Sequence, residues 1–252
     1  MIRAVVFDLG GTLHLCSSSE ARKVWFARRL IDRLGEYGIA LDISPEALAK
    51  QLGTNAEIYK HEAEITRREL APEVVWNDYY LREQRLGLDT LAPIAEELSF
   101  LYDYERVCNL RRPHLLECMQ ALRDAGLRLG LISNILSRSI VQHFVAEYGL
   151  QDYMECVITS AGTGIRKPDP AIFREAERQL DLPPEALAYV GDTLSRDVRG
   201  TREAGWRLAI QIFSPTASRR DAGMAELGYK ADYNITDLME IPAIIAAENE
   251  GV

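Results

Sequence analysis

The sequence lacks the cysteine pairs that mark disulfide frameworks and zinc sites. It has only four cysteines in 252 residues, and they are widely scattered, with no two in a C-x-x-C pair. This pattern predicts neither a disulfide framework nor a zinc centre, and we expect reduced thiols. The cysteines are Cys16, Cys108, Cys118 and Cys156.

Long apolar runs and an excess of basic residues are missing too. No apolar stretch approaches the roughly 20 residues that span a bilayer, and the N-terminus enters a strand without a basic and apolar leader. We therefore expect a cytoplasmic protein. The net charge of -9 argues against a surface built for nucleic acid or anionic membrane, and we expect neither as a partner. Nothing in the pattern favours a particular oligomeric state.

Apolar strand candidates alternate with helical stretches over most of the chain. Beyond the N-terminal strand, candidates occur at residues 127–132, 156–159, 187–190 and 207–212. Such alternation predicts right-handed βαβ units and a parallel sheet, which defines the α/β fold class. A hydrophobic content of 47% is sufficient for a proper core.

One long region breaks this alternation. Residues 17–106 have a helical pattern throughout, with Ser44 and Pro45 as an N-cap and first-turn proline. We therefore predict a helical domain at 17–106, inserted after the first strand. Residues 1–16 and 107–252 then form the α/β core.

The N-terminal strand ends in a single carboxylate followed by glycines. Val5, Val6 and Phe7 lead into Asp8, and Gly10 and Gly11 follow. An acid at the carboxyl end of a parallel strand stands where open α/β folds bind their ligands, so Asp8 is a candidate nucleophile or metal ligand. A strand followed by an ordinary polar turn accounts for this stretch equally well.

Two further polar clusters follow later strands. Ser133 and Asn134 come directly after the strand at 127–132, where a hydroxyl and backbone N–H groups can hold phosphate oxygens. Lys167 precedes Pro168, which restricts the lysine to an extended backbone. Taken singly, the first cluster is typical of a capped loop and the second of a solvated surface lysine.

The last cluster holds two carboxylates after the strand at 187–190. Gly191 is followed by Asp192, and Asp197 comes five residues later. Asp192 and Asp8 could bind a hard cation together, with Asp197 steadying the site. A glycine and an aspartate at a turn are common, so this cluster alone is only moderately specific.

In this order, the four clusters resemble the haloacid dehalogenase superfamily of aspartate-nucleophile hydrolases. The resemblance implies a Rossmann-like parallel sheet with helices on both faces, and it makes the helical insertion an all-α cap. It implies that Asp8 is the nucleophile, Ser133 and Asn134 bind the phosphoryl oxygens, and Lys167 neutralises charge between phosphate and Asp8. Asp192 would bind Mg²⁺, and Thr12 and Asp197 are expected to support the site.

Gly10 departs from the family pattern. The family's phosphatases usually have an acid two residues after the nucleophile, which protonates the leaving group and activates water. A glycine removes that side chain but keeps the backbone carbonyl that the family uses as a metal ligand. The metal set implied for this chain is therefore Asp8, Gly10 and Asp192, and losing a positioned acid/base typically costs about 10² to 10⁴ in rate.

Three readings of this glycine compete. In the first, a working phosphatase takes its proton from elsewhere, with His14 as the candidate shuttle beside Glu57 and His61. In the second, the scaffold performs C–P or C–halogen hydrolysis. The third is a catalytically impaired binding protein. Lys167 and Asp192 favour the first, so we expect a Mg²⁺-dependent hydrolase of a small phosphorylated metabolite.

Overall fold

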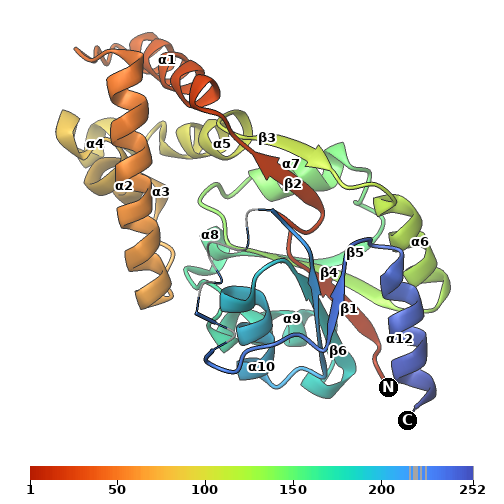
Figure 1. Ribbon diagram of the computed structural model, residues 1–252. Helices are drawn as coiled ribbons and strands as arrows, with labels where there is room; N and C mark the ends of the chain where they lie inside the picture. Colours follow the sequence, from red (N-terminus) through yellow and green to blue (C-terminus); the bar gives the residue numbers. More distant parts are fainter. Residues whose placement is uncertain (216, 218–220, 222, 225, 252) are drawn as a thin grey trace.

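The computed structural model describes residues 1–215, 217, 221, 223–224 and 226–251. Six parallel strands form the main sheet, in the order β5-β4-β1-β6-β7-β8 (Figure 1). This arrangement confirms the predicted α/β core. The strands are β1 (Ala4–Phe7), β4 (Arg128–Ser133), β5 (Met154–Thr159), β6 (Leu187–Gly191), β7 (Leu208–Ile212) and β8 (Tyr233–Ile235).

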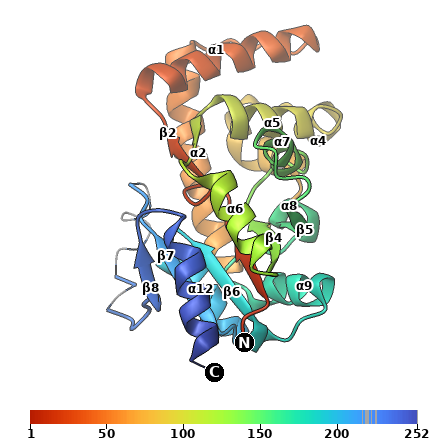
Figure 2. The same ribbon diagram turned by 90° about the vertical axis from the view of Figure 1, so that its right-hand side faces the viewer.

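Helices cover both faces of this sheet, as alternation along β1 requires. Val5 and Phe7 belong to one buried cluster with α6, α7 and α12, whereas Ala4 and Val6 belong to another with α9. Figure 2 shows α6 and α12 together on one side and α9 on the other. The core helices are α6 (Leu115–Asp124), α7 (Ile140–Glu147), α8 (Ser160–Thr163), α9 (Pro170–Leu180), η3 (Pro184–Ala186), η4 (Leu194–Val198), α10 (Arg199–Ala204) and α12 (Glu240–Glu250).

A two-stranded antiparallel ribbon joins the core to the insertion. It pairs β2 (His14–Ser17) with β3 (Cys108–Arg111). The sequence pattern predicts neither strand. Because β2 lies between β1 and α1, the helical insertion follows this second short strand and not β1 directly. The two strands have mixed exposure and are brought together by long-range pairing, so neither has a clear apolar pattern of its own.

The insertion is helical, as expected, and we call residues 20–105 the cap. It lies beyond the end of the sheet toward which the parallel strands run (Figures 1 and 2). Its own buried cluster includes Trp76, whose indole N–H donates to Ser99 Oγ at 2.9 Å. The cap helices are α1 (Glu20–Glu36), α2 (Pro45–Thr66), α3 (Pro72–Val75), η1 (Trp76–Tyr80), η2 (Arg82–Gln84), α4 (Leu88–Leu91) and α5 (Ala95–Glu105).

Local helix signals are confirmed. Ser44 caps α2 by accepting from the N–H of Ala47, with Pro45 in the first turn. Asp169 caps α9 in the same way, and Pro170 begins that helix. None of the helices in the described ranges is both long and apolar enough to cross a membrane.

Candidate active site

Asp8 follows the last residue of β1, in the middle of the sheet. Neighbouring strands fix its backbone, because β1 pairs with β4 and β6 and the Asp8 N–H donates to Val190 O at 2.9 Å. Its carboxylate is buried and accepts a hydrogen bond from Thr12 Oγ1 at 3.3 Å. The strand therefore presents Asp8 at the carboxyl edge of the sheet, and Thr12 lies in direct contact with it.

Lys167 is the centre of the buried cluster. Its Nζ lies 2.6 Å from Asp8 Oδ1 and 2.7 Å from Asp197 Oδ1. It also donates to Tyr189 OH at 2.8 Å and to Ile132 O at 3.1 Å. This side chain is almost inaccessible to solvent. The ordinary alternative of a solvated surface lysine is therefore wrong.

Tyr189 is a member of the cluster that sequence reasoning missed. It lies on β6, is 1% exposed, and its hydroxyl donates to Ile132 O at 3.0 Å while it accepts from Lys167. An aromatic residue inside an apolar strand has the pattern of an ordinary core residue. Only the fold shows that its hydroxyl reaches the lysine.

Asn134 binds the backbone of Lys167 through both ends of its amide. Its Nδ2 donates to Lys167 O at 2.9 Å, and its Oδ1 accepts from the Lys167 N–H at 2.8 Å. Asn134 therefore fixes the lysine loop in this structure, a contact that the expected phosphoryl-binding role did not include. Ser133 is the buried last residue of β4, on the strand next to Asp8.

Two glycines allow the remaining carboxylates to approach. A Cβ atom on Gly11 would lie 2.0 Å from Asp192 Oδ2, and Gly11 has φ +94°, a conformation that favours glycine. A Cβ atom on Gly191 would lie 2.4 Å from the Cβ of Asp197. Larger residues at either position would displace an acid of the site.

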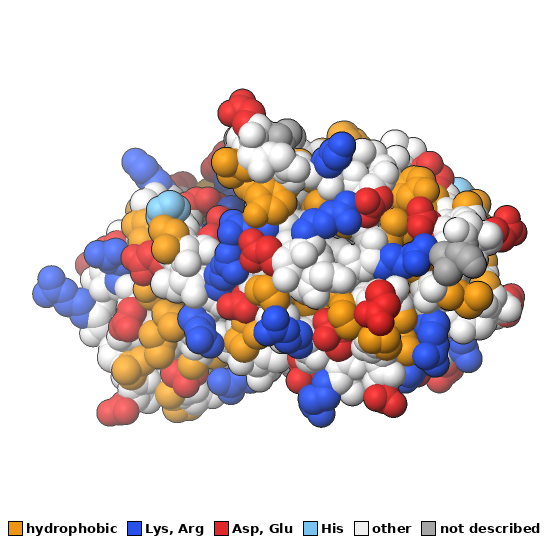
Figure 3. Space-filling model, turned by 90° about the horizontal axis from the view of Figure 1, so that it is seen from below, with side chains coloured by type: hydrophobic (Ala, Val, Ile, Leu, Met, Phe, Trp, Pro, Cys, Tyr) orange, Lys and Arg blue, Asp and Glu red, His pale blue; other side chains and the backbone are white. Residues whose placement is uncertain are grey.

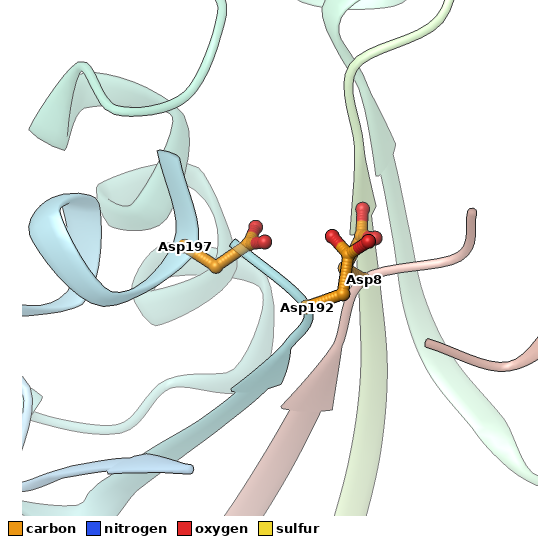
Figure 4. Close-up of side chains that lie close together, drawn as sticks. All are labelled: Asp8, Asp192 and Asp197. Carbon is orange, nitrogen blue, oxygen red and sulfur yellow. The ribbon is translucent and has the colours of Figure 1, made fainter. Parts of the chain in front are cut away.

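Asp8, Asp192 and Asp197 converge at the sheet edge (Figure 4). Each offers an oxygen within 4.8 Å of the others. Asp197 is already engaged, because its Oδ1 accepts from Lys167 and its Oδ2 accepts from Thr193 Oγ1 at 2.6 Å. Asp8 Oδ1 also accepts from Lys167, whereas its Oδ2 accepts a longer bond of 3.3 Å from Thr12 Oγ1. Carboxylate and carbonyl oxygens suit Mg²⁺, which takes one or two protein carboxylates and completes its shell with water and substrate oxygens.

Burial and the lysine act in opposite directions on these acids. Burial raises the pKa of Asp8, although Lys167 acts to lower it. Burial also acts to raise the pKa of Asp197, but the positive charges of Lys167 and Arg196 outweigh it and the pKa is lowered. Asp197 is therefore held as the anion that binds Lys167. A cation beside Asp8 would favour its ionised form as well.

His14 lies next to the position of the missing acid. A Cβ atom on Gly10 would be 3.8 Å from His14 Nε2, with only ordinary van der Waals contacts. The imidazole is buried against Phe144, its Nδ1 lies 3.0 Å from Tyr148 OH, and burial lowers the pKa of His14 to about 4. His14 is therefore neutral at pH 7. The alternatives Glu57 and His61 are exposed on α2.

A parallel α/β core with a buried aspartate and lysine at its carboxyl edge and a helical cap above is the architecture of the haloacid dehalogenase-like hydrolases. The chain belongs to this family, whose model matches residues 2–205. It is therefore a hydrolase of the class that the sequence motifs resemble.

Proteins similar to this chain are named as phosphatases. The chain is 31% identical over 208 residues to the glyceraldehyde 3-phosphate phosphatase of Methanopyrus kandleri, covering 81% of this chain and 82% of that protein. It is 26% identical to the ribulose-1,5-bisphosphate 5-phosphatase of Halopiger xanaduensis, covering 98% of this chain and all of the other.

Solved structures agree on the fold. A haloacid dehalogenase-superfamily (HAD) phosphatase from Thermococcus onnurineus has a TM-score of 0.60 at 26% identity, with 97% of this chain and 98% of that chain covered. A 2-haloacid dehalogenase from Pseudomonas syringae has a TM-score of 0.67 at 22% identity, with 98% and 99% covered. The second likeness concerns the fold alone.

Proposed function

We propose that the protein is a Mg²⁺-dependent phosphatase that acts on a small phosphorylated metabolite through an aspartyl-phosphate on Asp8. The observation that carries the proposal is the 2.6 Å contact between Lys167 Nζ and Asp8 Oδ1 in a buried cluster that also contains Asp192. Relatives named for glyceraldehyde 3-phosphate and phosphoserine support a small substrate.

The first step is attack by the Asp8 carboxylate on phosphorus. The bond between phosphorus and the leaving oxygen breaks in line, and the alcohol leaves. The phosphoryl group stays on Asp8 until water hydrolyses the aspartyl-phosphate. A Mg²⁺ ion held by Asp8, Asp192 and the Gly10 carbonyl would offset charge on the phosphoryl oxygens. Lys167 offsets the repulsion between the carboxylate and phosphate, and Asp197 keeps the lysine in place.

Ser133 stands at the same sheet edge as Asp8, which supports a role in binding the phosphoryl oxygens. Asn134 would share that role through the lysine loop that it holds. Thr12 would orient Asp8 through its hydroxyl. The cap would close over this edge. We assign the inserted domain that contains it to residues 17–106, and the core to residues 1–16 and 107–252.

Gly10 leaves two proton transfers without an assigned group: protonation of the leaving oxygen and deprotonation of the attacking water. His14 is the candidate shuttle because its Nε2 is directed at the space of the missing side chain. Tyr148, hydrogen-bonded to the other ring nitrogen, would orient it. A neutral imidazole is able to accept a proton from the attacking water, whereas a pKa of about 4 makes it a poor donor at pH 7. Substrates with good leaving groups would be favoured.

The net charge of the chain favours a small-molecule substrate over nucleic acid. Basic and acidic side chains are interspersed on the face shown in Figure 3, where no extended basic stripe is visible. This agrees with the acidic net charge of -9. We propose neither nucleic acid nor membrane as a partner.

A panel of phosphate esters tests the proposal. The full chain would be incubated with sugar phosphates, glyceraldehyde 3-phosphate, phosphoserine, an aryl phosphate and a 2-haloacid, with Mg²⁺ or with EDTA. Released phosphate and halide would be measured. Turnover that needs Mg²⁺ supports the phosphatase. Tight binding of a phosphate ester without phosphate release would favour the binding protein, and release of halide from a 2-haloacid would favour the dehalogenase.

A further inference from the structure

The cap touches the core at several places besides the β2–β3 ribbon, and one of them is next to Lys167. The segment after α2, residues 67–70, lies along the loop that carries Lys167. The Glu69 N–H donates to Gly164 O at 3.0 Å, and the Arg166 N–H donates to Arg67 O at 3.0 Å. An isolated antiparallel bridge between Arg68 and Ile165 stands between these bonds. The cap segment is therefore docked on the lysine loop by backbone hydrogen bonds.

Glu69 adds a buried carboxylate to this contact. Its side chain is 1% exposed and forms an ion pair with Arg166 of the core. It accepts from Ser160 Oγ at 2.5 Å, and it accepts from Tyr59 OH of the cap. A buried carboxylate needs such a full set of donors, and here two of the three come from the core.

One core partner of Glu69 lies in the lysine loop, and the other, at the start of α8, binds the segment that follows Ser133. Ser160 Oγ accepts from the Ile135 N–H at 2.8 Å, directly after Ser133 and Asn134. Arg166 immediately precedes Lys167. Glu69 therefore contacts the loop that aims the lysine directly, and it reaches the segment expected to bind phosphate through Ser160. The proposed reaction steps give Glu69 no role.

We infer that Glu69 is a positioning residue that couples cap docking to assembly of the catalytic edge. When the cap docks, the Glu69 carboxylate holds Ser160 and Arg166 in place. Through these two residues it fixes the Ser133 segment and Lys167. This inference rests on the proposed phosphatase function, because the loops that it orders are those that would bind and neutralise phosphate. A misplacement of about 1 Å in such groups is enough to lower a rate about 100-fold.

Another ion pair of the same cap segment supplies a matched control. Arg67 Nη1 lies 3.0 Å from Glu203 Oε2, which joins the cap segment to α10. Glu203 also pairs with Arg199, and neither belongs to the loops at 133–138 or 164–168. Glu203→Gln weakens docking of the cap without touching the catalytic edge.

The experiment compares the full-length wild type with Glu69→Gln, Ser160→Ala and Glu203→Gln. Two readouts are taken: kcat and KM for a phosphate ester that the wild type hydrolyses, and amide hydrogen exchange at 133–138 and 164–168. We expect Glu69→Gln to lower kcat about 10- to 100-fold with a much smaller change in KM, and to speed exchange in both segments. Ser160→Ala should speed exchange at 133–138 only, and Glu203→Gln should leave kcat and both segments near wild type.

Two results would overturn the inference. One is wild-type exchange in both segments of Glu69→Gln together with an unchanged kcat. The other is an equal fall in kcat for Glu69→Gln and Glu203→Gln, which would make docking in general responsible. If Glu69→Gln does not fold, unchanged exchange at 133–138 in Ser160→Ala overturns it. A wild type without phosphatase activity would refute the proposed function, and the exchange data would still decide the role of Glu69.

Discussion

The Nε2 atom of His14 lies 3.8 Å from the point where a Cβ atom would stand on Gly10. The backbone of Gly10 needs no left-handed conformation, and no contact there is tighter than this one. The site can therefore accept the acid that the family usually has at this position. Gly10 is a chemical departure that the local geometry does not require.

Gly10→Asp should therefore restore a proton donor. We expect kcat for alkyl phosphates to rise at least about tenfold, and kcat for aryl phosphates to rise less, because aryl leaving groups need less protonation. Steady-state kinetics on one substrate of each kind measure the difference. His14→Gln is the companion variant, and a large loss in it would show that His14 already serves. No gain for Gly10→Asp on either substrate would contradict an unmet need for a proton shuttle.

Lys167→Met should cost both activity and stability. It leaves the carboxylates of Asp8 and Asp197 buried together without their ammonium partner, and breaking a buried pair of this kind costs about 3 kcal/mol or more. Urea denaturation at pH 7 gives the free energy of unfolding. Arg178→Met, which removes an exposed pair with Glu175, is the control and should change little. Wild-type stability of Lys167→Met would show that the cluster is less tightly coupled than its distances indicate.

Asp103 should make the stability of the protein depend on pH. It is partly buried on α5 and accepts from the Ser137 N–H of the core at 3.1 Å. Burial is the main cause that raises the pKa of Asp103 to about 7, and the charges of Glu69 and Glu96 add to it. The Ser137 N–H and Arg106 act in the opposite direction. The folded pKa of Asp103 is above the unfolded one, so the protonated carboxyl favours the folded state. This contribution to the free energy of unfolding is complete below about pH 4 and is lost as the pH rises through 7.

Asp103→Asn removes that titration and keeps an acceptor for Ser137. Between pH 5 and pH 8 we expect the free energy of unfolding to fall by about 2 kcal/mol less in the variant than in the wild type, after discounting for partial exposure. At pH 8 it should be the more stable of the two. Thermal or urea unfolding at both values measures this. An identical pH dependence in the two proteins would mean that Asp103 does not titrate in this range.

The sequence was sufficient to place Asp8, Lys167 and Asp192 at one edge, because parallel strands that end in polar residues bring those ends together. Helix N-cap signals such as Asp169 before Pro170 depend on neighbouring residues alone, and for this reason the sequence also predicts them. Tyr189 and Glu69 were missed. Tyr189 has the pattern of a buried strand residue, and Glu69 lies just after the end of α2. The partners of both come from distant parts of the chain.

The same limit applies to short elements. β2 and β3 pair across the whole cap, in a register that sets His14 opposite Arg111, and neither strand has a clear apolar alternation. Asn134 illustrates a different difficulty. A strand-end asparagine suits phosphate binding, but which backbone its amide meets depends on the lysine loop that returns beside it 33 residues later.

Phosphate release from Asp8→Asn with Mg²⁺ and the best ester of the panel tests the nucleophilic role of Asp8 most directly. Asparagine keeps the shape of the side chain but is a far poorer nucleophile. We predict a fall in kcat of at least about 10³-fold in a variant that remains folded by circular dichroism. Full Mg²⁺-dependent activity in Asp8→Asn would contradict the assignment of Asp8 as the nucleophile.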